Sequence, residues 1–481
     1  MLEKLELNTM PNLEKWTISV EEEEEADVDD EEEEEEDNNN LHLLSSMFPR
    51  LKDLSLEDCG KLRRVPMLSA WVIQHLTSLH NLEIKGLEGL VSLPDCPAPA
   101  TLEELYIEKC SSLVRLPDCF FENLNSLSEF QIWSCHKFAS LPEGIRHLIT
   151  LKHLQINDCQ GLTTLPEGLG SLSSLQVLKI GNCSDLSSLP QGIQHLTALK
   201  TLHIWASPVL KALPEGLGSL SSLEELEIQY CSDLSSLPQG IQHLSALRTL
   251  VISGCSGLKT LPKGLGNLSS LQVLEIRSCF DFSSLPQGIQ HLTALKTLNI
   301  LGCPVLETLP EGLGSLSSLE ELEIQDCCNL SFLPEGIQHL TTLKKLGILE
   351  CPGLKTLPKG LGSLLSLEEL EIEGCCNLSS LPEGIQHLTA LKKLIISECL
   401  HLKKLPEGLE SLSSLFEAFQ ISDCSCLRAS PDGLGDLDSD YSCYRASSDG
   451  RGDLDSDYSR YRASIDGLSD LDSDGVIEFS D

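Results

Sequence analysis

Cysteine, a side chain suited to redox and metal chemistry, recurs at a fixed spacing along this 481-residue chain. Neighbouring strands of a stacked parallel sheet place Cβ atoms about 4.8 Å apart, beyond the ~3.5–4.5 Å of a disulfide. The spacing therefore predicts structural thiols rather than disulfides or a metal site. The thiols lie on one 24-residue grid with Ser207 in its single gap, at Cys135, Cys159, Cys183, Cys231, Cys255, Cys279, Cys303, Cys327, Cys351, Cys375 and Cys399.

A second column of reactive side chains is formed by histidines 48 residues apart, namely His147, His195, His243, His291, His339 and His387. Successive members are two repeats apart, or about 10 Å by strand spacing. That is too far to share a zinc ion, whose bonds are about 2 Å long. The chain also lacks a Ser-His-Asp, HExxH or kinase signature, so we predict a non-enzymatic protein with no catalytic or cofactor-binding residue.

The last twelve residues match the spacing of an EF-hand calcium loop, with a glycine at the required turn. The last ligand position holds an aspartate where a longer glutamate is usual. Copies of DLDSD precede this loop, and their low hydrophobicity and high charge predict a disordered acidic tail over 430–481. Calcium binding by the loop 470–481 is the alternative function, with the ligands Asp470, Asp472, Asp474, Val476, Glu478 and Asp481.

The elements that position these side chains follow from one repeat, residues 309–327. Leu322 and Ile324 alternate with polar neighbours, which predicts a short strand with one buried face. The Leu-Pro-Glu-Gly stretch at 309–312 predicts a type I turn. Leu313, Leu316 and Leu319 recur every three residues, which indicates a 3₁₀-like or irregular segment. Two repeat types alternate, LP[EK]GL and LP[EQ]GI, so the larger unit is 48 residues.

About 17 such repeats are expected. The predicted fold is an α/β solenoid: an arc with a parallel β-sheet on its concave side and a mostly irregular or 3₁₀ convex side. We expect a first strand and turn in 1–20, an acidic low-complexity loop in 21–40, and the solenoid in 41–429.

The formal net charge of −39 is concentrated in residues 21–37 and 430–481. The folded part offers no basic stripe, which argues against nucleic acid as a partner. No apolar run approaches the ~18 residues of a membrane span, and the N-terminus has no secretory pattern. A cysteine-rich chain without such a pattern predicts a cytoplasmic protein with reduced thiols.

The strings LEKLELNTMPNLEKW (2–16), FPRLKDLSLEDCGKLRRVP (48–66) and the LxxLxIxxCxxLxxLPxGIxxLTxLKxLxI units resemble the leucine-rich-repeat region of plant nucleotide-binding leucine-rich-repeat disease resistance proteins. The resemblance covers about residues 1–429. It implies a protein-binding module of innate immunity that senses a pathogen effector or a guarded host protein. It also implies that the repeat cysteines turn inward and satisfy loop backbone groups.

The chain departs from that family in having no G-x-x-x-x-G-K-[ST] phosphate loop, so nucleotide binding is not carried over. A nucleotide-binding module is expected to be supplied by another or a longer chain. A nonfunctional receptor fragment is one further alternative. An extracellular repeat protein is another, and it would carry glycans at the N-x-[ST] sites Asn182, Asn267, Asn329 and Asn377.

The outward strand positions differ between repeats while the apolar positions agree, so binding is expected on the concave face. Trp133, Trp205 and Arg277 are the leading candidates, because aromatic and arginine side chains are common binding anchors. Further along, Glu321, Lys345, Glu369 and Lys393 alternate in charge and are expected to neutralise one another across strands. The full set of predicted contacts is Glu129, Trp133, His153, Lys179, His203, Trp205, Glu227, Glu275 and Arg277.

Overall fold

The computed structural model describes residues 2–9, 49–59, 76–407, 409 and 418–427. All of them belong to one compact unit, residues 1–435. The predicted acidic loop at 21–40 and the predicted tail at 430–481, with its calcium loop, lie outside the described residues.

The described residues contain the predicted parallel solenoid, with 17 strands of five residues in a single sheet. Each strand pairs in parallel with its neighbours in sequence, so that Leu322 lies opposite Leu298 on one side and Leu346 on the other. The strands are β1 (Lys4–Asn8), β2 (Asp53–Glu57), β3 (Asn81–Lys85), β4 (Glu104–Glu108), β5 (Glu129–Trp133), β6 (His153–Asn157), β7 (Val177–Gly181), β8 (Thr201–Trp205), β9 (Glu225–Gln229), β10 (Thr249–Ser253), β11 (Val273–Arg277), β12 (Thr297–Leu301), β13 (Glu321–Gln325), β14 (Lys345–Leu349), β15 (Glu369–Glu373), β16 (Lys393–Ser397) and β17 (Ala418–Ser422).

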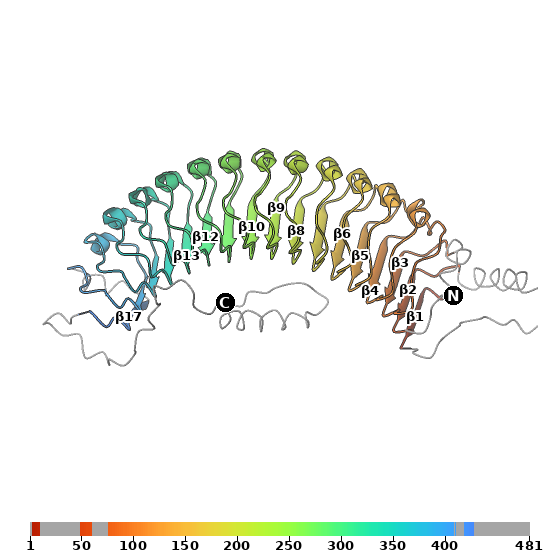
Figure 1. Cartoon of the computed structure of the whole chain (residues 1–481), viewed down its shortest axis with the longest axis horizontal. Coiled ribbons are helices and arrows are strands. Elements are labelled where there is room, and N and C mark those ends of the chain that lie inside the picture. The colour runs from red at the N-terminus through yellow and green to blue at the C-terminus, as the bar shows by residue number, and fades with distance from the viewer. Residues whose placement is uncertain (1, 10–48, 60–75, 408, 410–417, 428–481) are drawn as a thin grey trace, which may run out of the picture. The chain divides into compact units, whose positions relative to one another are not determined.

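The core consists of aliphatic side chains stacked along the unit. In β13, Leu322 and Ile324 are fully buried, as the alternation predicts, and Leu313, Leu316 and Leu319 reach the same core from the other side of the repeat. The sheet lines the concave side and the 3₁₀ segments line the convex side (Figure 1). Each repeat therefore buries its apolar face against its neighbours, and the repeats depend on one another for stability.

The convex side is built from short 3₁₀ helices, which confirms the prediction from the three-residue leucine spacing. The predicted type I turn is wrong, because Pro310 is extended (φ −68°, ψ 141°) and the 3₁₀ helix begins at the next residue. The helices are η2 (Asp118–Phe121), η3 (Glu143–His147), η4 (Glu167–Ser171), η5 (Gln191–His195), η6 (Glu215–Ser219), η7 (Gln239–His243), η8 (Lys263–Asn267), η9 (Gln287–His291), η10 (Glu311–Ser315), η11 (Glu335–His339), η12 (Lys359–Ser363) and η13 (Ile385–His387).

The 48-residue unit has a structural basis in contacts between successive 3₁₀ helices. A Cβ at Gly314 of η10 would lie 2.0 Å from the carbonyl oxygen of Gly336 in η11, so this close approach requires glycine. In an earlier unit, the Glu167 carboxylate of η4 accepts hydrogen bonds from the backbone N–H groups of Gln191 (3.1 Å) and Gly192 (2.6 Å) at the start of η5. An LPEGL repeat thus caps the LP[EQ]GI repeat that follows it.

The residue after each strand has a left-handed backbone conformation, which the sequence analysis missed. Non-glycine residues adopt it at many repeats, including Asn182 (φ 49°), Tyr230 (φ 52°) and Asp326 (φ 52°). Asn and Asp tolerate this region best after glycine. Asp, Asn or Gly immediately precedes six of the eleven grid cysteines, and this was the signal available in the sequence.

Candidate functional site

The three outward side chains of each strand form three columns along the sheet, and we call this surface the concave face. The parallel register fixes which residues are neighbours, so that Lys179, His203 and Glu227 are adjacent in the middle column. The structure places all nine predicted contacts on the concave face, with Glu129 and Trp133 on β5, His153 on β6, Lys179 on β7, His203 and Trp205 on β8, Glu227 on β9, and Glu275 and Arg277 on β11.

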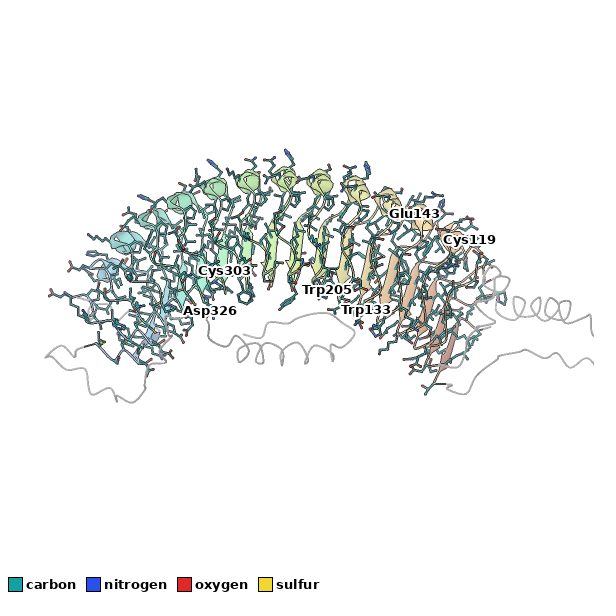
Figure 2. All side chains as sticks on the ribbon, in the orientation of Figure 1. Cys119, Trp133, Glu143, Trp205, Cys303 and Asp326 are labelled. Carbon is teal, nitrogen blue, oxygen red and sulfur yellow. The ribbon has the colours of Figure 1, made fainter. Side chains whose placement is uncertain are left out.

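The two tryptophans lie on the concave face but are half-buried. Figure 2 shows Trp133 and Trp205 at the inner edge of the repeats, far from Glu143 on the convex side. The indole of Trp205 covers Gly181 on the neighbouring strand, where an added Cβ would lie 1.8 Å from Trp205 Cε2. The glycine thus creates the space that holds the ring.

Trp133 is held by a chain of hydrogen bonds along its own strand. Its Nε1 donates to Gln131 Oε1 (2.9 Å), and Gln131 Nε2 donates to Glu129 Oε1 (2.6 Å). Side chains that are already fixed lose less conformational entropy when a partner binds. Both tryptophans therefore have the rigidity expected of binding anchors.

A shallow hollow of about 260 Å³ lies on this part of the concave face. Glu129 and Lys179 bring opposite charges to its lining. Pockets for small molecules are usually about 300–1,000 Å³ and mostly apolar, whereas this hollow is smaller and polar. Its dimensions suit a single protein side chain. The remaining lining residues are Gln131, His153, Leu154, Gln155 and Val177.

A carboxylate pair beside the hollow was missed in the sequence analysis. The Tyr106 hydroxyl on β4 lies close to the carboxylates of Glu104 and Glu129 and has a single proton to share between them. Burial, followed by the charge of Glu129, raises the pKa of Glu104, and burial also raises the pKa of Tyr106. Two carboxylates that repel each other around a tyrosine favour the approach of a cation. The Glu-x-Tyr pattern of β4, next to the first residue of β5, was the signal in the sequence.

The C-terminal part of the concave face contains ion pairs across strands, which confirms part of the expected neutralisation. Lys345 Nζ lies 3.1 Å from Glu321 Oε1 and 3.7 Å from Glu323 Oε2. Lys393 Nζ lies 2.5 Å from Glu371 Oε1, so it pairs with a different column from the one expected. A partner would have to break these pairs, which makes this region the less available surface.

Two of the predicted contacts pair with each other within β11. Arg277 Nη2 lies 2.6 Å from Glu275 Oε2. The Arg277 side chain therefore has a carboxylate partner already, and a binding partner would have to compete with it. Arg277 is therefore less available to a binding partner than Trp133 and Trp205.

The grid cysteines are buried, and no cysteine of the described residues is in a disulfide. The Cys183 thiol lies 3.2 Å from the carbonyl oxygen of Gly181, the last residue of β7, so it contacts the end of a strand rather than the loop backbone that was expected. Burial raises the pKa of Cys183, Cys303 and Cys375 to about 12. These thiols are protonated and structural, because nucleophilic and metal-binding cysteines are thiolates. The histidine column ends the 3₁₀ helices on the convex side.

Comparison with known proteins agrees with this architecture. Residues 140–259 and 229–353 match the family described as "Leucine-rich repeat region". An Arabidopsis thaliana protein named as a putative disease resistance protein is 29% identical over 92 residues. That alignment covers 19% of this chain and 10% of the relative, so the chain matches about a tenth of the relative's length.

Among solved structures, Toll in the Drosophila Toll–Spätzle complex is similar with a TM-score of 0.50 and 17% identity, over 78% of this chain and 49% of that chain. A leucine-rich-repeat protein of Leptospira interrogans has a TM-score of 0.42 and 22% identity, over 79% of this chain and 98% of that chain. A search of the described residues for a helix long and apolar enough to cross a membrane found none. The strand register, the 24-residue period and the family match together show that this chain is a leucine-rich-repeat protein.

Proposed function

We propose that this protein is a non-catalytic recognition module whose concave face, between β4 and β9, binds a basic segment of a partner protein. The observation that carries the proposal is the contrast between the two faces of the sheet. Inward positions of these strands are leucine, isoleucine or phenylalanine and are fully buried, whereas outward positions change from strand to strand. The fold thus leaves the concave face free to vary with the partner.

The charge of this surface favours a basic partner. Between β4 and β9 the only lysine at the outward positions is Lys179, whereas the glutamates are Glu104, Glu129, Glu225 and Glu227, together with Glu108, which is already paired with Lys109 at 3.2 Å. Complementary charge speeds association and disfavours acidic competitors. The fixed indoles of Trp133 and Trp205 supply apolar anchors next to these carboxylates.

We further propose that the recognised partner is a pathogen effector or a guarded host protein, and that the protein acts in plant defence in the cytoplasm. The repeat motifs resemble plant disease resistance proteins, and the Arabidopsis relative carries such a name. In this proposal the nucleotide-binding module that converts recognition into a signal is supplied by another or a longer chain.

The binding proposal is tested by comparing partners of the wild-type protein with those of two concave-face variants and one convex-face control. Trp205→Ala and Glu129→Lys should each weaken a partner's affinity by about 2 kcal/mol, or about 30-fold, as is typical of a binding hot spot. His195→Ala, on the exposed convex side, should leave the affinity unchanged. Candidate partners are identified by cross-linking in infected plant tissue, and affinities are then measured with purified proteins by calorimetry.

Unfolding midpoints of the same variants separate recognition from folding. If a partner binds all three variants with wild-type affinity, it does not use the concave face, and the proposal fails. Loss of affinity together with an equal loss of stability in Trp205→Ala would show that this side chain serves the fold.

The defence role has an independent test. Disruption of the gene in its host plant should increase pathogen growth, and re-expression of the wild-type chain should reverse that increase. Re-expression of the Trp205→Ala variant should not. Equal pathogen growth with and without the gene would contradict the defence role while leaving the binding proposal intact.

A further inference from the structure

Three potential metal ligands meet on the concave face at the boundary between β8 and β9: His203, Glu225 and Glu227. One ligand atom from each residue lies within 4.8 Å of the others, and this is the only such group of three or more found in the described residues. His203 Nε2 lies 3.5 Å from Glu225 Oε1, and His203 Nδ1 lies 3.8 Å from Glu227 Oε2. We call this group the His203 cluster.

One separation within the His203 cluster is close to the ligand spacing of a tetrahedral metal site. Bonds of about 2.0–2.2 Å to nitrogen and oxygen ligands place neighbouring ligand atoms about 3.4 Å apart. The separation of 3.5 Å between His203 Nε2 and Glu225 Oε1 is close to that edge length. The parallel register places His203 directly opposite Glu227, so side-chain rotations alone would complete the arrangement.

The imidazole of His203 has an unused ligand atom. Only 18% of the His203 side chain is exposed, and its Nε2 atom is buried without a hydrogen-bond partner. A buried polar atom without a partner is unfavourable, because it has lost its hydrogen bonds to water. A metal ion at this nitrogen would supply the missing interaction.

The two carboxylates are also under-neutralised. Within the described residues, the only ion-pair partner of Glu225 and Glu227 is the imidazole of His203. Two negative charges held together in a half-buried position favour a divalent cation. The geometry, the unpaired nitrogen and the charge therefore point to the same ligand.

We propose that the His203 cluster is a binding site for a divalent transition-metal ion, with Zn²⁺ as the favoured ion and water at the open coordination position. One imidazole and two carboxylates form a donor set that suits zinc, and the known preference of calcium and magnesium for all-oxygen sites disfavours those ions. The site goes beyond the proposed protein recognition and does not depend on it. Trp205 lies on the same strand as His203, so a bound ion would order the surface next to this anchor (Figure 2).

The test is Zn²⁺ titration of the full-length, metal-stripped protein by calorimetry, after accessible thiols have been blocked with iodoacetamide. The wild-type protein should bind one more equivalent of Zn²⁺ than His203→Ala. Changes in the surroundings of metal ligands alone alter affinity by about 10–100-fold, so losing a ligand should weaken the site by about 100-fold or more. Glu225→Gln keeps the side-chain shape and should weaken the same site.

His153→Ala is the matched control, because it removes a histidine from the concave face two strands away and should leave the Zn²⁺ stoichiometry unchanged. Equal Zn²⁺ binding by the wild type, His203→Ala and Glu225→Gln would overturn the proposal. Circular dichroism of each variant establishes that it is folded. A second readout is the unfolding midpoint, which Zn²⁺ should raise in the wild type and in His153→Ala but not in His203→Ala.

If His203 instead serves only as a contact partner of the two glutamates, Zn²⁺ will not raise the midpoint of any variant. That outcome also overturns the metal site.

Discussion

Ser207 is the one residue that breaks the cysteine grid, and the structure predicts that restoring the cysteine will stabilise the protein. Ser207 is fully buried, and its Oγ has no hydrogen-bond partner. At the equivalent position of the two neighbouring repeats, the thiols of Cys183 and Cys231 lie 3.2 Å and 3.5 Å from backbone carbonyl oxygens. The substitution Ser207→Cys would place the same group in the same backbone setting.

The expected gain follows from the cost of the buried hydroxyl. A buried polar group without a partner costs about 1–3 kcal/mol, and a thiol behaves as a small apolar group that transfers readily out of water. Some of that gain is lost if the core must adjust to the larger sulfur atom. We therefore expect Ser207→Cys to stabilise the repeat by about 1–2 kcal/mol, which lowers the population of its open form by about 5–30-fold.

Native-state hydrogen exchange is the suitable assay, because solenoid stability is a sum of repeat terms and nearest-neighbour interfaces. Peptides from β8 and β9 should exchange more slowly in Ser207→Cys, while peptides from β14 to β16 should be unchanged. Ser207→Ala removes the hydroxyl without adding a thiol, so it should be close to the wild type or slightly more stable. The reverse change, Cys183→Ser, should destabilise its own repeat by a similar amount.

Unchanged or faster exchange in Ser207→Cys would refute this reasoning, and Ser207→Ala would show why. If Ser207→Ala slows exchange and Ser207→Cys does not, the thiol does not fit the repeat. If both variants exchange faster than the wild type, the hydroxyl has a partner such as a buried water molecule, and the premise is wrong.

Other substitutions test the convex side and the charges near the sheet. Gly314→Ala should destabilise by about 1–3 kcal/mol because its methyl group meets a backbone carbonyl, whereas Gly312→Ala meets a flexible side chain and should cost less; urea denaturation compares the two. Glu167→Ala removes a 3₁₀ cap and should cost about 0.5–2 kcal/mol in the same assay. Burial and nearby carboxylates raise the pKa of Glu350 in the folded state, so Glu350→Gln should exceed wild-type stability at pH 7 and lose that advantage below the unfolded pKa of about 4.5. Glu368 is the opposite case, because its lysine partner lowers its pKa; Glu368→Gln should be less stable at pH 7, and the difference should shrink on acidification as pH falls through that lowered pKa.

The fold was predictable because one period determines nearly all of it. A 24-residue repeat with Leu and Ile at alternating positions specifies the strand, its buried face and the register of its neighbours. The expected count of about 17 repeats corresponds to the 17 strands of the sheet. The last repeat is displaced by one residue, because Cys424 lies 25 residues after Cys399 and β17 pairs with β16 at the same offset.

Details that depend on side-chain direction were not predictable from the period. The sequence placed Trp205 at an outward position of β8, but the burial of its ring depends on Gly181 of the neighbouring strand β7. The predicted type I turn at 309–312 was wrong for a related reason: Pro310 is extended, and the 3₁₀ helix begins only at the residue after it. The ligand atoms of His203 and Glu225 come from different columns, and their approach depends on rotamers that a pattern of residue types does not specify.

The distribution of charge explains why recognition should concentrate in the N-terminal half of the concave face. In β13 to β16, Lys345 and Lys393 are already ion-paired across strands with Glu321, Glu323 and Glu371, so a partner that binds these glutamates would have to replace existing ion pairs. Near β4 and β5, the pKa of Glu104 is raised by burial and by the neighbouring carboxylate, so the free protein holds an unfavourable negative charge there. A lysine or arginine of the partner would relieve that repulsion, and this relief would contribute to the binding free energy.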